Sequence, residues 1–313
     1  MRKLILLVVT FGLVGFASAE TVWIDTDVSI GSPFREVDDA YALVLALHSP
    51  EIRIAGVSTT YGNAPLPATT RIAQELVRQF GEAGMVSPEQ VFAGARSPAD
   101  LGRRSEASEA LAKALEKHSV TYIALGPLTN LATFLQLHPG IARQIKRVIF
   151  VGGQPEGTTL ALGANQSFQI HDANVFKDSR ATALLLATKI PVTLVPIATG
   201  SHLTLNEQDL RELARRGGAG SYLSGRSGVW LWFWTHFART NGGPIFDALA
   251  IVAAARPELV SMETRHARMD ETGNLRVTFR LTSGARGVRV GTSLQAGTKD
   301  IVLRRLMSRQ NRE

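Results

Sequence analysis

Four aspartates lie close together in the N-terminal part of the chain. Asp25 and Asp27 end a short apolar run, and Asp38 and Asp39 follow eleven residues after Asp27, where a helical pattern opens. Carboxylates that converge on one strand end repel each other strongly unless a cation lies among them. A helix N-terminus stabilises one negative charge but does not account for four. Oxygen ligands without cysteine or histidine are typical of Ca²⁺ or Mg²⁺ sites rather than zinc sites, so the spacing predicts a divalent-metal site.

The segments that would position these aspartates alternate between short apolar runs and longer helical patterns. The runs are rich in β-branched residues and predict buried strands. We therefore expect an α/β fold: a single domain with a Rossmann-like, mainly parallel central sheet and helices on both faces. Ligands of such folds bind at the carboxyl ends of the strands, where these aspartates fall. The expected strands are Thr21–Thr26, Ile52–Thr60, Thr121–Leu125, Val148–Gly152 and Pro191–Ala198, and the expected helices are Ala40–His48, Ala68–Phe80, Glu106–Lys117, Leu128–Leu137 and Ser179–Thr188.

The last third of the chain is less regular. Leu205–Arg215 is predicted to be a helix capped by Asn206, and a last helix is expected to begin near Phe246. The alternating segments Leu275–Thr282 and Gly287–Val290 predict a terminal pair of strands. No internal repeat or linker indicates a second domain.

Five blocks with aspartate, asparagine or glycine residues follow one another between Val22 and about Pro257. They are Asp25-Thr26-Asp27 with Asp38-Asp39-Ala40; Ser58-Thr59-Thr60-Tyr61-Gly62-Asn63; Leu125-Gly126-Pro127-Leu128-Thr129-Asn130; Asp172-Ala173-Asn174-Val175 with Asp178 and Ala181; and Phe246-Asp247-Ala248-Leu249-Ala250. These blocks resemble the inosine-uridine preferring nucleoside hydrolases, in the order that this family has them. One Asp-x-Asp pattern would be weak evidence, whereas five ordered blocks are specific. In the first block the loop Val28–Val37 is longer than in most members.

The resemblance implies an enzyme that uses calcium to hydrolyse the N-glycosidic bond of ribonucleosides, releasing free base and ribose. Asp27, Asp39, Asp247 and the carbonyl of Leu125 would hold Ca²⁺. A water and the ribose 2′- and 3′-hydroxyls would complete its coordination, which calcium's flexible geometry allows. Asp27 would also accept a proton from the attacking water as the general base. The transition state at C1′ would have oxocarbenium character, stabilised by nearby carboxylates.

The same resemblance assigns the sugar contacts. Asp38 would bind the ribose 2′-hydroxyl, and Asn63 and Asn174 would hold the sugar hydroxyls. Asp172 stands in place of a glutamate and would reach the 5′-hydroxyl with one methylene less. A further asparagine contact of the family has two candidates in this chain, Asn165 and Gln166.

One departure concerns the leaving base, because Phe246 stands where many members have a histidine that protonates it. His236 is a candidate proton donor, the alternative being a core or surface histidine. Trp230, Trp232 and Trp234 are candidates for stacking on the base, since nucleobases prefer π-faces. The alternative for these tryptophans is a hydrophobic face, because their spacing predicts a strand or irregular loop.

The first nineteen residues have the pattern of a secretory signal peptide. Arg2 and Lys3 precede the apolar run Leu4–Phe16, and Ala17-Ser18-Ala19 forms a small-residue cleavage site. We therefore expect residues 20–313 to form the mature nucleoside hydrolase domain, exported to a periplasm or secreted. The chain has no cysteine, which excludes a lipoprotein anchor and disulfides. No stable membrane anchor is expected after cleavage, and export favours salvage of external purine or pyrimidine nucleosides.

Composition and charge bound the other partners. Of the 313 residues, 45% are hydrophobic and 19% charged, which is typical of a globular domain rather than of a disordered chain. The net charge of +7 arises largely from the arginine-rich stretch Arg265–Arg312. Aromatic residues do not interleave the last of these charges, so we interpret the stretch as a solvated surface and expect no nucleic-acid polymer as partner. The family resemblance implies a homodimer or homotetramer.

Two other functions fit part of the pattern. A non-catalytic periplasmic protein that binds nucleosides or ribose is compatible with the missing histidine, although a binder needs no metal to activate water. A phosphatase of the haloacid-dehalogenase type is compatible with Asp25-Thr26-Asp27 after an apolar strand. That enzyme needs a late pair of acids for Mg²⁺, however, and Asp247 stands alone.

Overall fold

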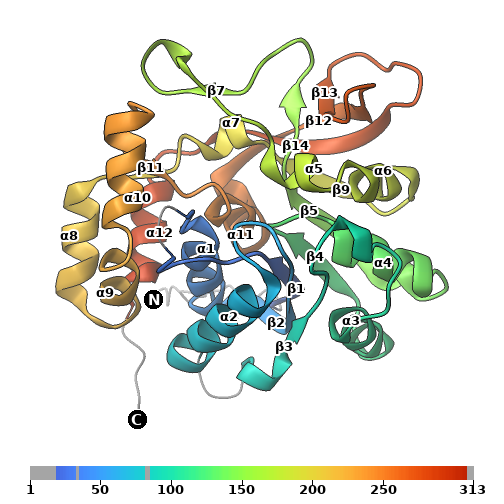
Figure 1. Cartoon of the computed structure of the whole chain (residues 1–313), viewed down its shortest axis with the longest axis horizontal. Helices are drawn as coiled ribbons and strands as arrows, with labels where there is room; N and C mark the ends of the chain where they lie inside the picture. Colours follow the sequence, from blue (N-terminus) through green and yellow to red (C-terminus); the bar gives the residue numbers. More distant parts are fainter. Residues whose placement is uncertain (1–18, 33–34, 82–84, 309–313) are drawn as a thin grey trace, which may run out of the picture.

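The computed structural model describes residues 19–32, 35–81 and 85–308, so the predicted signal peptide lies almost wholly outside the described residues. Within this part of the chain a ten-stranded sheet has the order β3-β2-β1-β4-β5-β9-β14-β12-β13-β6 (Figure 1). The strands from β3 to β14 run parallel, and β12 is antiparallel to both of its neighbours. The strands of this sheet are β1 (Glu20–Thr26), β2 (Ile52–Thr59), β3 (Val91–Ala93), β4 (Val120–Ala124), β5 (Ile145–Val151), β6 (Gln154–Pro155), β9 (Val192–Val195), β12 (Val260–Met269), β13 (Leu275–Thr278) and β14 (Arg286–Leu294).

Helices cover both faces of the sheet. Helices α1, α2, α11 and α12 contribute to one hydrophobic core, and α3, α4 and α6 contribute to the other. Two short strand pairs lie outside the sheet: β7 (Ala161–Leu162) with β8 (Phe168–Gln169), and β10 (Thr204–Leu205) with β11 (Gly243–Pro244). The helices are α1 (Asp38–Leu47), α2 (Leu66–Phe80), α3 (Glu106–Lys117), α4 (Thr129–Leu137), α5 (Ala173–Lys177), α6 (Ser179–Ala187), α7 (Ile197–Gly200), α8 (Glu207–Arg216), α9 (Gly218–Ser224), α10 (Gly228–Trp232), α11 (Ala248–Ala255) and α12 (Thr298–Leu306).

The apolar runs of the sequence become strands that are buried on both sides. In β1, Val22 and Ile24 face the core under α1, whereas Trp23 faces the core under α3 and α4. Successive side chains of a strand point to opposite faces, so a strand covered on both faces must be apolar at every position. The predicted α/β fold, with a mainly parallel sheet between two layers of helices, is confirmed.

The order of the strands brings distant segments of the chain to one edge. β1 lies between β2 and β4, and Thr26 pairs with Thr59 while Asp25 pairs with Ala124. The three strands therefore end side by side, and the residues that follow each of them meet there. Helix α1 starts at this edge and packs beside α11, so that the N-termini of both helices reach it (Figure 1).

Three expectations about the last third of the chain were wrong or incomplete. The aromatic segment is not a strand or loop but α10, continued by a π-helical turn at Phe233–Phe237. Because a helix carries residues three and four apart on one side, Trp230 and Trp234 face inwards and Trp232 faces outwards. The helix near Phe246 is not the last, since α12 follows it, and β12 was not predicted. In the described residues no helix is long and apolar enough to span a membrane.

The packing of Trp23 against Gly56 gives a test of how β1 is held. A Cβ atom on Gly56 would lie 2.4 Å from the buried Trp23 ring, whose Nε1 donates to Ser58. We expect Gly56→Ala to lower the free energy of unfolding by about 1–3 kcal/mol, because the ring is enclosed and must shift. Chemical denaturation measures this. Gly287→Ala in β14 is the matched control, since nothing lies within 4 Å of its Cβ position. Equal effects of the two substitutions would contradict this account.

Candidate active site

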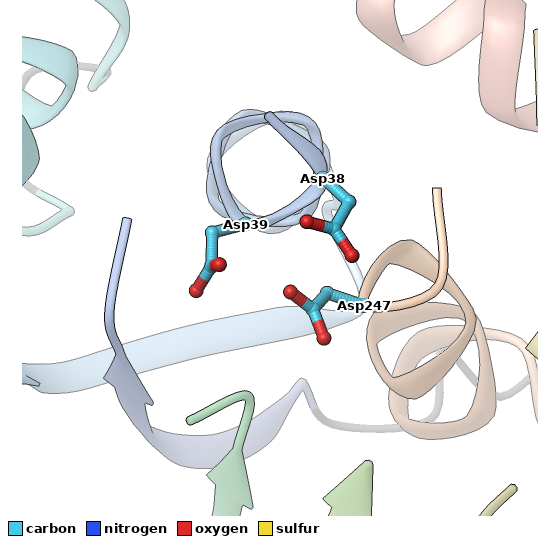
Figure 2. Close-up of side chains that lie close together, drawn as sticks. All are labelled: Asp38, Asp39 and Asp247. Atoms are coloured by element: carbon cyan, nitrogen blue, oxygen red, sulfur yellow. The ribbon is translucent and has the colours of Figure 1, made fainter. Parts of the chain in front are cut away.

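Three buried carboxylates converge at the edge where β1, β2 and β4 end. Asp38 and Asp39 form the first turn of α1, and Asp247 directly precedes α11. One oxygen from each side chain lies within 4.8 Å of one oxygen from each of the others. Figure 2 shows the three side chains pointing into the space between the two helices. The sequence predicted that Asp38 and Asp39 would lie at this edge, and the family resemblance implied that Asp247 would share a metal with Asp39. The structure brings all three together.

Burial and mutual repulsion disfavour negative charge on these groups. Burial, followed by repulsion from Asp27, raises the pKa of Asp39 to about 8. The pKa values of Asp38 and Asp247 are also raised well above the usual range, by burial first and then by neighbouring carboxylates. The Oδ1 atom of Asp38 is buried without a hydrogen-bond partner in the described part of the chain. The cluster therefore has oxygen donors, and excess negative charge, that a cation would satisfy.

Asp27 lies beside this cluster. Its backbone N–H donates to Oδ1 of Asp39 over 3.1 Å, and its Oδ2 accepts from the backbone N–H of Asn63 over 2.8 Å. The Nδ2 of Asn63 lies 3.0 Å from Asp39 Oδ2 and 3.4 Å from Asp27 Oδ1. The ammonium of Lys177 forms an ion pair with Asp27 Oδ2 at 3.3 Å. Asn63 therefore fixes the two carboxylates relative to each other, and Lys177 supplies a positive charge.

The carbonyl of Leu125 lies at the end of β4, as the family resemblance implied. It accepts a hydrogen bond of 2.7 Å from Nδ2 of Asn174, which also donates to the carbonyl of Val151 over 3.0 Å. A carbonyl oxygen has two lone pairs, so this bond leaves one available to a second partner. Asn174 thus ties together the ends of β4 and β5.

A cavity of about 290 Å³ opens on these residues, close to the smallest size typical of small-molecule sites. One part of its lining, the polar group, contains Asp38, Asn63, Asn174 and Asp247. The other part, the aromatic group, contains Phe168, Phe233, Trp234 and Phe246, whose rings contact one another. Trp234 lies edge-to-face against Phe168 and Phe246, with ring centroids 6.0 and 5.8 Å apart. The lining residues are Glu36, Asp38, Asn63, Leu125, Val151, Phe168, Ile170, His171, Ala173, Asn174, Ile197, Phe233, Trp234, Phe246 and Asp247.

Asp172 is buried but does not line this cavity. Its side chain caps α5, with Oδ1 accepting from the N–H of Val175 and Oδ2 from that of Gly153. Burial raises its pKa to about 6, and these backbone hydrogen bonds act in the opposite direction. The structure thus occupies both oxygens with backbone donors, and a sugar contact by Asp172 stays a prediction. The exposed Gln166 does not line the cavity either.

The structure does not bring His236, Trp230 or Trp232 to the cavity. His236 is exposed and stacks on Trp232, which is itself 55% exposed. The helical turn of this segment directs both side chains outwards, so the expectation that His236 could reach the leaving base is not supported. Trp230 is buried, and its Nε1 donates to Glu36 over 2.7 Å. It contacts the cavity lining rather than forming part of it.

Sequence reasoning did not single out Glu36, Phe168, Phe233 or Lys177, which the structure places in or beside the cavity. Glu36 lies in the extended loop that follows β1, and nothing in the sequence indicates which side chains it contacts. Of the three candidate tryptophans, Trp234 lines the cavity, because the helical turn places it with Trp230 on the inner side. No local signal in the sequence marks Lys177 or Phe168.

A metal fits this donor set. Calcium and magnesium are hard cations bound by carboxylate and carbonyl oxygens, and Asp38, Asp39 and Asp247 present such oxygens at mutual distances that one ion can bridge. Asp27 is joined to Asp39 by a hydrogen bond, and Leu125 lines the same cavity as Asp38 and Asp247. The expected ligands Asp27, Asp39, Leu125 and Asp247 are therefore neighbours, although the tightest group contains Asp38 in place of Asp27.

Comparisons with known proteins agree with this geometry. The family model described as inosine-uridine preferring nucleoside hydrolase matches residues 22–299. Uridine nucleosidase 1 of Arabidopsis thaliana is 28% identical over 281 residues, which cover 81% of this chain and 79% of the relative. A pyrimidine-specific ribonucleoside hydrolase of Citrobacter koseri is 24% identical over 269 residues, covering 75% of this chain and 81% of the relative.

Solved structures show the same fold. A plant nucleoside hydrolase superposes with a TM-score of 0.75 at 24% identity, over 92% of this chain and 98% of the other. A purine-preferring ribonucleoside hydrolase from Gardnerella vaginalis gives 0.74 at 20% identity, over 92% and 97%. The family match excludes the phosphatase alternative considered from the sequence.

The raised pKa values predict how pH acts on the metal-free protein. Asp39 holds its proton in the folded state up to about pH 8 but has an ordinary pKa of 3.8 when unfolded. Its contribution to stability is full below the unfolded value and is lost as pH rises through the folded one. In the presence of a chelator we expect the free energy of unfolding to fall by about 1 kcal/mol or more between pH 5 and 8.

Denaturant titrations at several pH values measure this fall. Asp39→Asn should reduce the pH dependence because it removes one of the groups that titrate, and added calcium should raise stability most at pH 8. A metal-free stability that stays constant or rises between pH 5 and 8 would contradict the burial argument.

Proposed function

Because the chain belongs to the inosine-uridine preferring nucleoside hydrolase family, whose members are N-glycosidases, we propose that it hydrolyses ribonucleosides to free base and ribose with bound calcium. One observation carries this proposal: the acidic cluster of Asp38, Asp39 and Asp247 opens directly on a cavity with an aromatic wall. A ribose with two adjacent hydroxyls suits the polar group of the lining, and a flat nucleobase suits the aromatic group.

The residues around the cluster have separate tasks. Asp39, Asp247 and the carbonyl of Leu125, with Asp27 or Asp38, would hold the ion. Bound calcium would supply positive charge that acidifies a water and holds a sugar diol. Asn63 and Asn174, which both line the cavity, would orient the sugar hydroxyls by hydrogen bonds.

Asp27 is the proposed general base. Asn63 and Lys177 hold its Oδ2 from two sides, which fixes the direction of the carboxylate. A carboxylate fixed in this way would accept a proton from the water that attacks C1′. As the C1′–O bond forms, the C1′–N bond breaks and its electron pair moves to the base. The buried carboxylates would stabilise the positive charge that develops on the ribose.

The leaving base would lie against the aromatic group of the lining. Phe246 is part of this wall and offers no proton, in line with the substitution noted in the sequence. Phe168, Phe233 and Trp234 contact one another edge-to-face, and the base would stack on a ring face of this group. The family's usual donor at position 246 is therefore replaced in this chain by an apolar surface.

The proposed reaction is tested by release of reducing sugar from a panel of purine and pyrimidine nucleosides, with and without a chelator. We expect hydrolysis that the chelator abolishes and calcium restores. Asp27→Ala should lower kcat by about 100-fold or more, because the water loses its proton acceptor. Asp300→Asn on the exposed side of α12 is the matched control and should act as the unchanged enzyme does.

The outcomes separate the two functions considered. Chelator-sensitive hydrolysis that is lost in Asp27→Ala supports the enzyme. Calcium binding without release of ribose from any nucleoside would favour the binding protein instead, and the catalytic assignment would fail.

We also propose that the protein is exported. The charged, apolar and small-residue segments of residues 1–19 support this, and Glu20 is the first residue of β1, so cleavage after Ala19 would leave the sheet whole. Expression of the full chain in a Gram-negative host should yield periplasmic protein whose intact mass begins at Glu20. Cytoplasmic protein that retains Met1 or the first nineteen residues would contradict export.

A further inference from the structure

Glu36 is a carboxylate in the cavity that the reaction described above does not use. It belongs to the extended loop between β1 and α1, and its backbone carbonyl accepts a hydrogen bond from Ser29 over 2.8 Å. The loop therefore holds Glu36 at the point where α1 begins. Its side chain is partly buried and lines the cavity together with the aromatic residues.

Two indole groups fix one oxygen of this side chain. Trp230 donates from Nε1 to Oε2 over 2.7 Å, and Trp234 donates from Nε1 to the same oxygen over 3.4 Å. An indole N–H only donates, so Oε2 must be an acceptor. No described residue donates to Oε1, which leaves the second oxygen of Glu36 for a ligand.

Glu36 lies where the aromatic wall meets the acidic cluster. The negative charge of Glu36 repels Asp38, two residues further on, so the residue borders the cluster where the sugar hydroxyls would have their partners. Its side chain is bound on the other side by Trp234, which belongs to the aromatic wall through ring contacts with Phe168 and Phe246. Two indole N–H donors on one oxygen favour a carboxylate over the neutral acid at this position.

We propose that Glu36 determines which nucleobase is accepted, its Oε1 receiving a hydrogen bond from a ring N–H of the base. The favoured substrates are then nucleosides whose base carries an N–H beside a carbonyl, as hypoxanthine, guanine and uracil do. At the same ring position adenine and cytosine present a lone pair, which a carboxylate repels, so only their exocyclic amino group could donate to Glu36. This inference rests on the proposed hydrolase function.

The two indole N–H groups fix the orientation of the side chain in Glu36→Gln. Because an indole N–H only donates, the amide oxygen must take the place of Oε2. The NH₂ group then takes the place of Oε1. The acceptor that faces the base becomes a donor while the shape stays the same. The preference of kcat/KM for inosine over purine riboside, which has a lone pair at N1, should fall by roughly 10- to 100-fold.

The ratio of kcat/KM for inosine to kcat/KM for purine riboside is compared between enzymes. The difference in intrinsic reactivity of the two substrates is the same in each enzyme and therefore cancels. Glu207→Gln, in an exposed position on α8, is the matched control and should leave the ratio unchanged. Trp230→Phe removes one of the two donors to Oε2 and should lower the ratio in the same direction by a smaller factor. Thermal unfolding of each variant checks that the fold is kept.

A substitution that lowers kcat/KM equally for inosine and purine riboside would show that Glu36 only supports the loop, and would overturn the inference. An unchanged preference in Glu36→Gln would overturn it as well. If the unaltered protein hydrolyses no nucleoside of the purine and pyrimidine panel, the proposed function fails; calorimetric binding of free hypoxanthine and free purine to both forms then still tests Glu36. If it hydrolyses pyrimidine nucleosides alone, the ratio of kcat/KM for uridine over cytidine replaces the purine pair and should fall in Glu36→Gln.

Discussion

The constraint on which the site depends is the repulsion between carboxylates that the fold buries together. Asp38, Asp39 and Asp247 have oxygens within 4.8 Å of one another in a region almost without water. Separate negative charges are unfavourable there, so the groups must keep protons or share a cation. The neighbouring Asp27 intensifies the repulsion and is itself balanced by Lys177. The cluster is therefore a candidate cation site, because a bound cation would relieve the repulsion that burial imposes on these carboxylates.

The backbone around the cluster is arranged to allow this approach. Asp27 follows β1, Asn63 follows β2 and Leu125 follows β4, and these strands are neighbours in the sheet. Gly62 has a φ of +156°, and a Cβ atom there would lie 1.7 Å from Asp27 Oδ2. A glycine is required at this position so that the chain can turn and Asn63 can donate its N–H to the carboxylate.

The aromatic half of the cavity offers a ligand apolar surface instead of charge. Its aromatic walls provide dispersion and stacking surface but no proton, since Phe246 replaces a titratable group. Against this apolar background the carboxylate of Glu36 is a strong directional feature, because a polar atom in an apolar pocket must find its partner in the ligand. In the proposed reaction, the acidic cluster would therefore bind the sugar, and the oriented acceptor of Glu36 would distinguish the bases.

Local pattern was enough to predict the alternating strands and helices, the parallel sheet and the aspartates at its edge, because buried strands and amphipathic helices have short-range signatures. The family blocks added Asp39 and Asp247 as expected metal ligands. Pattern failed where partners come from distant segments: Glu36 meets Trp230 and Trp234 almost two hundred residues away. The side chain of His236 points outwards because this segment is helical, whereas the spacing of the tryptophans had predicted a strand or loop. Which side chains share a cavity depends on how helices pack across the sheet, and that long-range geometry has no signature in neighbouring residues.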